Sequence, residues 1–481
     1  MSRNPHVSSA EPVPSNRWVV LANVSLGTFM ATLDGSIANV ALPTMSSELQ
    51  APIHTVQWVL TAYLLTICAT LPIMGKISDL IGRSRVYNYG FIVFALGSAF
   101  CGLSQTLGVL IVSRIVQAIG ASCLMSNSQA IVADVFPAKE RGRAMGIVGT
   151  VVSLGSLTGP GIGGILVDRF GWPTIFWINI PIGIIACIAG SFLLPKDQVQ
   201  ERSKGFDFAG SALFIVGMVS FLYTISNGNE WGWTSPLTIG VLLVSFVILL
   251  CFYRWEVRLK QPMLDFSLYR IRAFRIGNMT ALLSFVAMFF VNVMMPFYME
   301  NVLHFTPEHT GYTMMMYPLT MAVVAPFSGW LSDKIGPNAL TTAGLVLNAI
   351  GFGLLSTLTV HESAWVVGLH LAIFGLGSGL FQSPNNASVM GAAPKPKLGT
   401  AGGLNALVRN IGMVLGISVS VSLYTTHLHM LGGDAAASDP LQMLGALHFV
   451  FWVALFVCLL ALAVSLGRFR RTEDKRSASH S

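Results

Sequence analysis

Charged side chains are scarce in this chain. Asp, Glu, Lys and Arg make up only 10% of its 481 residues, whereas they make up about 25% of an average soluble domain. Hydrophobic residues account for 53% of the chain, and the mean hydropathy is +0.67. This composition excludes a large soluble domain and indicates many membrane-spanning segments. The net charge of +7 is no sign of a nucleic-acid partner, because the basic residues lie in short segments between apolar runs.

The sequence also lacks the motifs of several kinds of chemistry. It contains no G-x-x-x-x-G-K-[ST] phosphate loop, which excludes ATP hydrolysis of the usual kind. Its six cysteines lie in apolar runs without a Cys-x-x-Cys pair, and no His, Cys and acidic residues cluster at metal-ligand spacing. We therefore expect neither a cofactor nor a metal. Transport would depend on a proton gradient or on the gradient of the substrate itself.

Long apolar runs are abundant instead. A helix needs about 20 apolar residues to cross a bilayer. Fourteen such runs predict an all-α membrane protein. The predicted spans are 18–42, 55–74, 86–104, 108–133, 144–167, 174–194, 208–227, 236–255, 275–299, 311–332, 339–358, 364–390, 400–425 and 444–467.

The basic residues predict the orientation of these spans. When the N-terminus is placed in the cytoplasm, Arg169 is the one basic residue in an outer loop, and Arg114 and Arg409 fall within spans. The other 25 of the 28 Lys and Arg residues lie in inner segments. Cytoplasmic loops are enriched in Lys and Arg, so we predict a multi-pass protein of the cytoplasmic membrane with both termini inside.

An internal repeat divides the chain. The pattern G-x-x-S-D-x-x-G occurs at residues 75–82, after the second span, and at 329–336, at the end of the tenth. Because the repeat follows span 2 and ends span 10, it pairs the first six spans with the last six and leaves two spans inserted between them. Two halves of this kind, with a binding site at their interface, are typical of transporters. The predicted parts are a tail 1–17, a six-helix bundle 18–194, an inserted pair 195–274, a second six-helix bundle 275–467 and a tail 468–481.

Asp34 is the only acidic residue that we place in the hydrocarbon part of a span. Inserting a carboxylate there costs roughly 3 kcal/mol or more, so such residues face a bundle interior and usually have a function. Arg114 is predicted at a similar depth, because Asp34 lies about 12 Å and Arg114 about 9 Å from the outer ends of their spans at 1.5 Å per residue. A buried arginine needs acceptors. We expect the two to form either a proton-coupling site or a static structural pair.

Four motifs resemble those of a known family. Residues 75–85 match the signature after the second helix of major facilitator superfamily transporters. Residues 114–120 match the helix-4 motif R-x-x-Q-G-x-G, with Ala118 in place of a glycine. Residues 155–164 match the helix-5 antiporter motif, and residues 33–43 match the helix-1 motif of the fourteen-helix group. The chain therefore resembles the drug:proton antiporters of the EmrB/QacA type, which implies the major facilitator fold and a role of the helix-4 arginine in proton coupling.

The other motif residues are candidates for gating. The helix-5 motif, which the resemblance assigns to export, is expected in a hinge or seal between the halves. In the cytoplasmic motif we expect Arg83 to pair with Asp134, and Asp79 to stabilise the outward-facing state by lying near a helix N-terminus of the other half. Alternatively, these charges only set topology. The candidates are Gly75, Asp79, Gly82, Arg83 and Asp134 in the cytoplasmic motif, and Gly155, Gly159, Pro160, Gly163 and Gly164 in helix 5.

Four residues are candidates for lining a substrate cavity, namely Asn39, Gln117, His370 and Arg409. His370 is equally well explained as a hydrogen-bonded structural histidine. Arg409 is equally well explained as a side chain that bonds helix backbone. Methionines in the ninth and tenth spans would give such a cavity an adaptable apolar lining.

These observations predict a secondary transporter, not an enzyme, that exports lipophilic or cationic drugs in exchange for protons by alternating access. A dedicated exporter of one metabolite, lipid, siderophore or antibiotic would carry the same motifs. A membrane-embedded transferase would need a catalytic cluster, for which His304, Glu308 and His309 are the only candidates. The expected partners are the small substrates and the lipid bilayer, without nucleic acid. We expect a monomer, joined by a periplasmic adaptor if the cell has two membranes.

Overall fold

The computed structural model describes residues 17–195, 197, 207–259, 262–394, 397–432 and 439–468. Within these ranges the chain is helical and contains no strand. The first half consists of α1 (Arg17–Glu48), α2 (Ile53–Val56), α3 (Trp58–Ile81), α4 (Arg83–Gly102), α5 (Leu107–Val135), α6 (Ala138–Phe170), α7 (Thr174–Trp177) and α8 (Asn179–Leu193). The inserted pair consists of α9 (Phe208–Trp231) and α10 (Pro236–Glu256).

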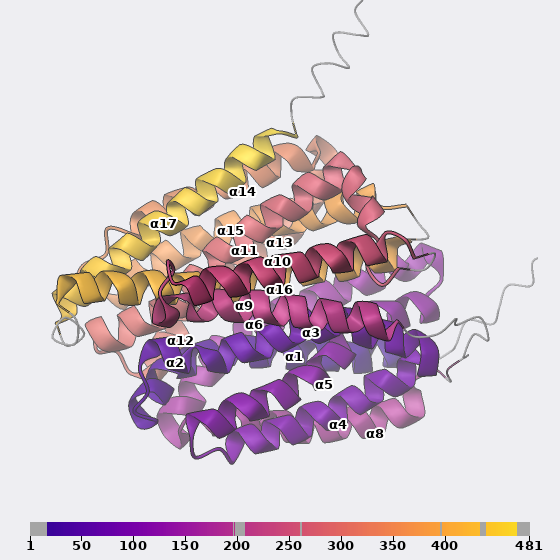
Figure 1. Cartoon of the computed structure of the whole chain (residues 1–481), viewed down its shortest axis with the longest axis horizontal. Coiled ribbons are helices and arrows are strands. Elements are labelled where there is room, and N and C mark those ends of the chain that lie inside the picture. The colour runs from indigo at the N-terminus through magenta and orange to yellow at the C-terminus, as the bar shows by residue number, and fades with distance from the viewer. Residues whose placement is uncertain are drawn as a thin grey trace, which may run out of the picture.

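The second half follows the inserted pair. It consists of the 3-10 turn η1 (Phe266–Arg270), α11 (Arg272–Phe297), the π turn η2 (Tyr298–Val302), α12 (Pro307–Met314), α13 (Met316–Ile335), α14 (Pro337–Leu355), α15 (Ala364–Ala392), α16 (Leu398–Leu431) and α17 (Pro440–Leu466). Figure 1 shows the two halves side by side, with α9 and α10 lying in front of them.

Local chemistry explains where several helices begin and break. Helix α7 ends at Trp177, because Pro181 has no N–H to donate to its carbonyl. In the same way α12 ends at Met314, four residues before Pro318. Helices also begin at side chains that accept a backbone N–H of the first turn. These caps are Thr106, Asp207, Ser235, Thr306, Ser363 and Asp439.

The predicted fold class is confirmed. Every predicted span coincides with a long helical segment, and 12 of these segments in the described part of the chain are long and apolar enough to cross a membrane. The two that fall short are α4, which begins with Arg83 and Arg85, and α6, which begins with a charged turn and is rich in glycine.

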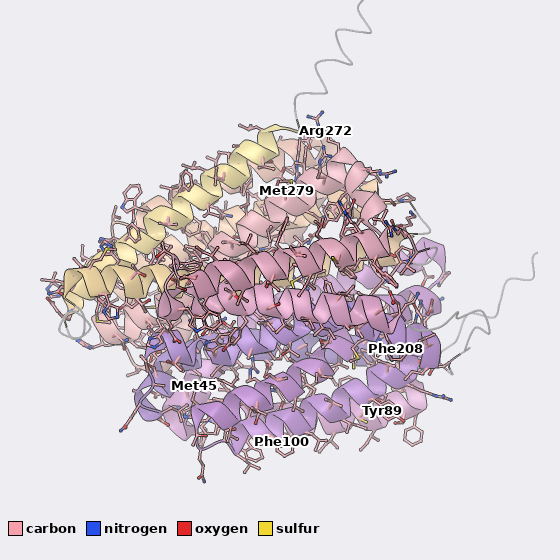
Figure 2. All side chains as sticks on the ribbon, in the orientation of Figure 1. Met45, Tyr89, Phe100, Phe208, Arg272 and Met279 are labelled. Atoms are coloured by element: carbon pink, nitrogen blue, oxygen red, sulfur yellow. The ribbon has the colours of Figure 1, made fainter. Side chains whose placement is uncertain are left out.

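Burial shows which helices are central. In α3, 72% of the most apolar window is buried, whereas in α10 only 17% is buried. On α4, Tyr89 and Phe100 project outward from the bundle, while Met45 on α1 is fully buried (Figure 2). Peripheral helices thus present large apolar side chains on the outside, as helices in contact with lipid do.

We name the two ends of the bundle after residues that lie there. At the Asp79 end, α3 finishes and α4, α9 and α11 begin; at the Glu308 end, α1 finishes and α12 begins. The Asp79 end is on the right in Figure 1, and α14 and α17 slant away from the first half toward that side.

Candidate functional site

A fully buried ion pair lies in the core of the first half. Arg114 Nη1 on α5 lies 2.6 Å from Asp34 Oδ2 on α1, and neither side chain has any exposed surface. The second carboxylate oxygen, Oδ1, accepts hydrogen bonds from Gln117 Nε2 at 2.8 Å and from Asn179 Nδ2 at 2.9 Å. Four helices, α1, α5, α8 and α3, therefore converge on one carboxylate and its counter-ion.

The arginine has a second set of contacts. Its Nε donates to the backbone carbonyl of Val59 on α3 at 3.0 Å, and its guanidinium lies 4.0 Å from the centre of the Tyr63 ring and 5.5 Å from that of Phe176. Its Nη2 is buried and has no hydrogen-bond partner among the described residues. A cation over aromatic faces is stabilised by the ring quadrupole, so Asp34 and the two rings together hold the charge of Arg114.

In this arrangement, the charge of Asp34 is what compensates the buried guanidinium of Arg114. A proton on Asp34 would remove the charge that compensates Arg114 and would leave a buried guanidinium without its counter-ion. An uncompensated buried charge is strongly unfavourable. Proton binding at Asp34 must therefore be accompanied by a rearrangement of α1 relative to α5.

The predicted cavity residues fall in different places. Gln117 is fully buried and donates to Asp34, so in this structure it belongs to the ion-pair cluster. Asn39 donates to the carbonyl of Gly35 at 3.3 Å, and its Oδ1 is buried without a partner in the described part of the chain. His370, on α15, is half-buried, and its Nδ1 is likewise unpartnered. Arg409, on α16, is also half-buried.

The helix-5 motif, on α6, has two faces with different contacts. Ser36 of α1 donates to the carbonyl of Gly155 at 3.2 Å, and a methyl group on Gly163 would lie 2.6 Å from the Ile37 side chain. This face of α6 packs on the helix that carries Asp34. The residues that face α1 are Gly155, Gly159 and Gly163.

The opposite face of α6 contacts the second half. A methyl group on Gly164 would lie 2.5 Å from the carbonyl oxygen of Pro307, and Gly311 of α12 packs against the carbonyl of Pro160. Arg169 Nη2 also lies 3.7 Å from Glu308 Oε1 across the two halves. Close backbone approach through glycine is a common way to pack membrane helices. The halves are therefore tightly joined at the Glu308 end.

We expect Gly164→Ala to open the Glu308 end. The added methyl group meets a backbone carbonyl rather than a flexible side chain, and such overpacking costs about 1–3 kcal/mol. That shifts the balance between closed and open forms by roughly tenfold or more. The rate at which a membrane-impermeant maleimide modifies Glu308→Cys, in a background without the native cysteines, measures the change.

Gly353→Ala is the matched control, because a methyl group on this helical glycine of α14 would meet nothing within 4 Å. Its maleimide rate should equal that of the unsubstituted protein. Equal rates for Gly164→Ala and Gly353→Ala would show that the α6–α12 contact does not hold this end closed.

The cytoplasmic motif forms a network within the first half. Arg83 Nη1 lies 2.8 Å from Asp134 Oδ2, and Arg83 Nη2 lies 3.0 Å from Asp79 Oδ1. Burial lowers the pKa of Arg83, but the carboxylates of Asp134 and Asp79 outweigh this effect and leave the pKa raised, so the guanidinium remains charged. In this structure Asp79 thus binds an arginine of its own half.

Two glycines of this motif have distinct surroundings. Gly82 has a φ of +113°, a backbone conformation that favours glycine, and it lets the chain turn into α4. The carboxylate of Asp197 caps that helix by accepting the N–H groups of Ser84 at 2.8 Å and Arg85 at 3.1 Å. Gly75 faces Ser126 of α5.

A second buried acidic side chain lies near the end of a long apolar segment. Glu300 lies in η2, inside the apolar segment Arg272–Val302, where it comes under the charge of Asp168 on α6. Its Oε1 is buried without a partner among the described residues. The predicted span ended one residue earlier, at 299, so the residue was read as part of a loop. Glu300 lies two residues from the end of that segment, whereas Asp34 lies near the middle of α1.

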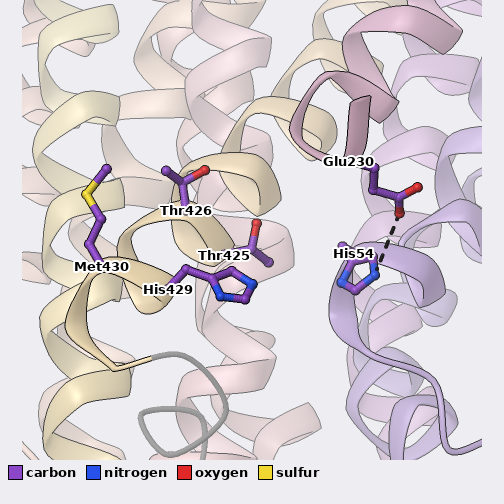
Figure 3. A pocket seen from close by; sticks show the side chains of 6 residues that line it. All are labelled: His54, Glu230, Thr425, Thr426, His429 and Met430. Carbon is purple, nitrogen blue, oxygen red and sulfur yellow. Dashed lines mark ion pairs between the residues drawn. The ribbon is translucent and has the colours of Figure 1, made fainter. Parts of the chain in front are cut away.

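A hollow of about 520 Å³ lies at the Glu308 end, where the first half, the inserted pair and the second half meet. His54 Nε2 on α2 lies 3.6 Å from Glu230 Oε1 on α9, with His429 of α16 across the hollow (Figure 3). None of the predicted site residues lines it. The lining consists of His54, Glu230, Thr425, Thr426, His429 and Met430.

Known proteins resemble this chain over nearly its whole length. Residues 24–417 match the Major Facilitator Superfamily. The riboflavin transporter RibZ of Clostridioides difficile is 38% identical over 96% of this chain and 99% of its own. The multidrug resistance protein Stp of Mycobacterium tuberculosis is 33% identical over 88% of this chain and 79% of its own. The solved human organic anion transporter MFSD10 (TETRAN) has a TM-score of 0.62 at 18% identity, covering 94% of this chain and 100% of that one, and so shares the fold.

The bundle of two halves and these similarities define a multi-pass membrane transporter, not an enzyme. The chain belongs to the Major Facilitator Superfamily. Its relatives include multidrug exporters and a riboflavin transporter, so small organic molecules are the substrates at the level of the family.

Proposed function

We propose that this protein exports small organic molecules in exchange for protons by alternating access. The observation that carries the proposal is the buried pair of Asp34 and Arg114, in which a carboxylate at mid-helix depth meets a single counter-ion. Membrane carboxylates in such positions commonly bind transported protons. The multidrug exporters among the relatives support drugs as the substrates.

Helix α1 would connect proton binding to the movement of the halves. One side of α1 carries Asp34, and another side packs Ser36 and Ile37 against the glycines of α6. The far side of α6 forms the contact with α12 that closes the Glu308 end. A shift of α1 that follows protonation would therefore change the packing of α6 and, through it, the closure of this end.

The Asp79 end would face the cytoplasm. In the described part of the chain outside the two tails, the Lys and Arg residues of the predicted inner segments lie at this end, as cytoplasmic loops are enriched in basic residues. Among the described residues, no ion pair at this end joins the first half to the second, whereas Arg169–Glu308 joins the halves at the other end. In this orientation, the joined Glu308 end would face outward, and the protein would load substrate from the cytoplasm.

Inside-out membrane vesicles test the proposal. After a respiratory substrate acidifies the vesicle interior, vesicles with this protein should accumulate at least one of the fluorescent probes ethidium, fluorescein and riboflavin, and a proton ionophore should release it. Vesicles without the protein provide the baseline. Accumulation that survives collapse of the proton gradient would contradict proton coupling.

A transporter dedicated to one metabolite is the second candidate. The similarity to RibZ extends over 96% of this chain at 38% identity, more than that to Stp. Riboflavin should then be carried in the same vesicles while ethidium is not. This outcome would retain proton coupling and would replace broad drug export with a single substrate.

A further inference from the structure

Only three charged side chains of the described helices lie six or more residues from both helix ends, and they are Asp34, Arg114 and Arg409. Asp34 and Arg114 compensate each other within 2.6 Å. Arg409 has no such partner, since the described residues give its guanidinium neither a hydrogen bond nor an ion pair. Among the described side chains, Arg409 is therefore the one positive charge in the middle of the bundle without an ion-pair partner.

Arg409 points toward the interior of the second half, not toward lipid. Gly412 and Gly416, three and seven residues further along α16, lie on the same helix face as Arg409. Methyl groups on these glycines would lie 2.9 Å and 2.6 Å from the backbone carbonyls of Leu282 and Val286 on α11. Arg409 is half-buried, and its nitrogens are not sealed off as Nη2 of Arg114 is. The guanidinium of Arg409 is therefore partly accessible and has no hydrogen-bond partner among the described residues.

The side chains around this position are polar but not acidic. Asn405, one turn before Arg409, donates to Asn386 Oδ1 on α15 at 3.3 Å. One turn before Asn386, the Gln382 amide lies 3.7 Å from the sulfur of Met288 and 3.8 Å from that of Met321. This wall offers hydrogen-bond donors and soft thioethers, and it offers no carboxylate to an organic cation.

We propose that Arg409 binds the substrate directly and that the substrate is rich in hydrogen-bond acceptors, with a carboxylate or a carbonyl-bearing ring edge, and carries no positive charge. This inference deepens the proposed function and rests on it, because it assumes that the transported substrate binds in the middle of the bundle. The planar guanidinium binds such groups through paired hydrogen bonds. An organic cation would meet uncompensated like charge, so the proposal departs from the cationic substrates expected from the sequence.

Equilibrium binding to the purified full-length protein tests the assignment without any proton gradient. Three fluorescent probes of similar size are titrated: riboflavin, which is neutral and carbonyl-rich; fluorescein, which is anionic; and ethidium, which is cationic. We expect riboflavin or fluorescein to bind more tightly than ethidium. Tighter binding of riboflavin would indicate a neutral, carbonyl-rich substrate, and tighter binding of fluorescein would indicate an anionic one.

We expect Arg409→Gln to weaken binding of that probe by about tenfold or more, as loss of a charge-assisted hydrogen bond does. Arg409→Lys keeps the charge and should retain part of the affinity. Arg254→Gln, at an exposed arginine near the end of α10, is the control and should leave the affinity unchanged.

Tighter binding of ethidium than of both other probes would overturn the inference, as would an unchanged affinity in Arg409→Gln or the absence of riboflavin and fluorescein binding. Failure of the proposed function gives a different result. In that case binding depends on Arg409, but a proton gradient drives no accumulation of the bound probe in vesicles.

Discussion

Asp34→Asn is expected to reduce proton-driven export to the level of vesicles without the protein. Asparagine has nearly the shape of aspartate but cannot bind and release a proton. The neutral amide also leaves the buried guanidinium of Arg114 without its counter-ion, at a cost of about 3–5 kcal/mol. Accumulation of substrate in inside-out vesicles, with and without a proton gradient, measures the loss.

Two controls separate coupling from misfolding. Glu48→Gln makes the equivalent change at an exposed position of the same helix and should export normally. Exchange of labelled for unlabelled substrate needs no net proton movement, so Asp34→Asn should retain it. Normal gradient-driven export by Asp34→Asn would show that the proton binds elsewhere, with Glu300 and His370 as the next residues to replace.

Arg114→Met should destabilise the protein by about 3–5 kcal/mol, because it leaves one partner of a buried ion pair without the other. Asp34 then keeps only the amide donors of Gln117 and Asn179. The double variant Asp34→Asn/Arg114→Met carries no buried charge at this site, so it should be more stable than Arg114→Met alone. Thermal unfolding in detergent, arranged as a double-mutant cycle, measures the interaction.

Arg409→Met is the matched control for stability. It makes the same substitution at another arginine far from the helix ends, but one without an ion-pair partner, so it should not destabilise the protein. If Arg114→Met is no less stable than Arg409→Met, the pair contributes little to the fold.

The ion pair could be predicted because depth can be counted along a helix. Asp34 and Arg114 were placed at similar depth by a rise of 1.5 Å per residue, and the structure joins them at 2.6 Å. Gln117 and Asn179 could not be assigned to this cluster in the same way. Which side of α5 and α8 faces α1 depends on the rotation of packed helices, which an almost uniformly apolar sequence does not encode.

The ends of the helices and the contacts of the two faces of α6 also could not be predicted in full from the sequence. Hydropathy ends the second span near residue 74, yet α3 continues to Ile81, because a helix extends beyond the hydrocarbon layer into polar surroundings. Glycines at three- and four-residue spacing predicted close contacts of the helix-5 motif. That Gly159 meets α1 while Gly164 meets α12 became visible only when both halves were placed.

Substrate-induced proton release from the purified protein tests the central claim most directly. If Asp34 is the coupling site and substrate favours its deprotonated form, then substrate added in weakly buffered detergent solution at the working pH releases up to about one proton per chain, by the reciprocity of coupled binding. Under the same conditions Asp34→Asn should bind substrate and release none. Equal proton release by the two proteins would contradict the account.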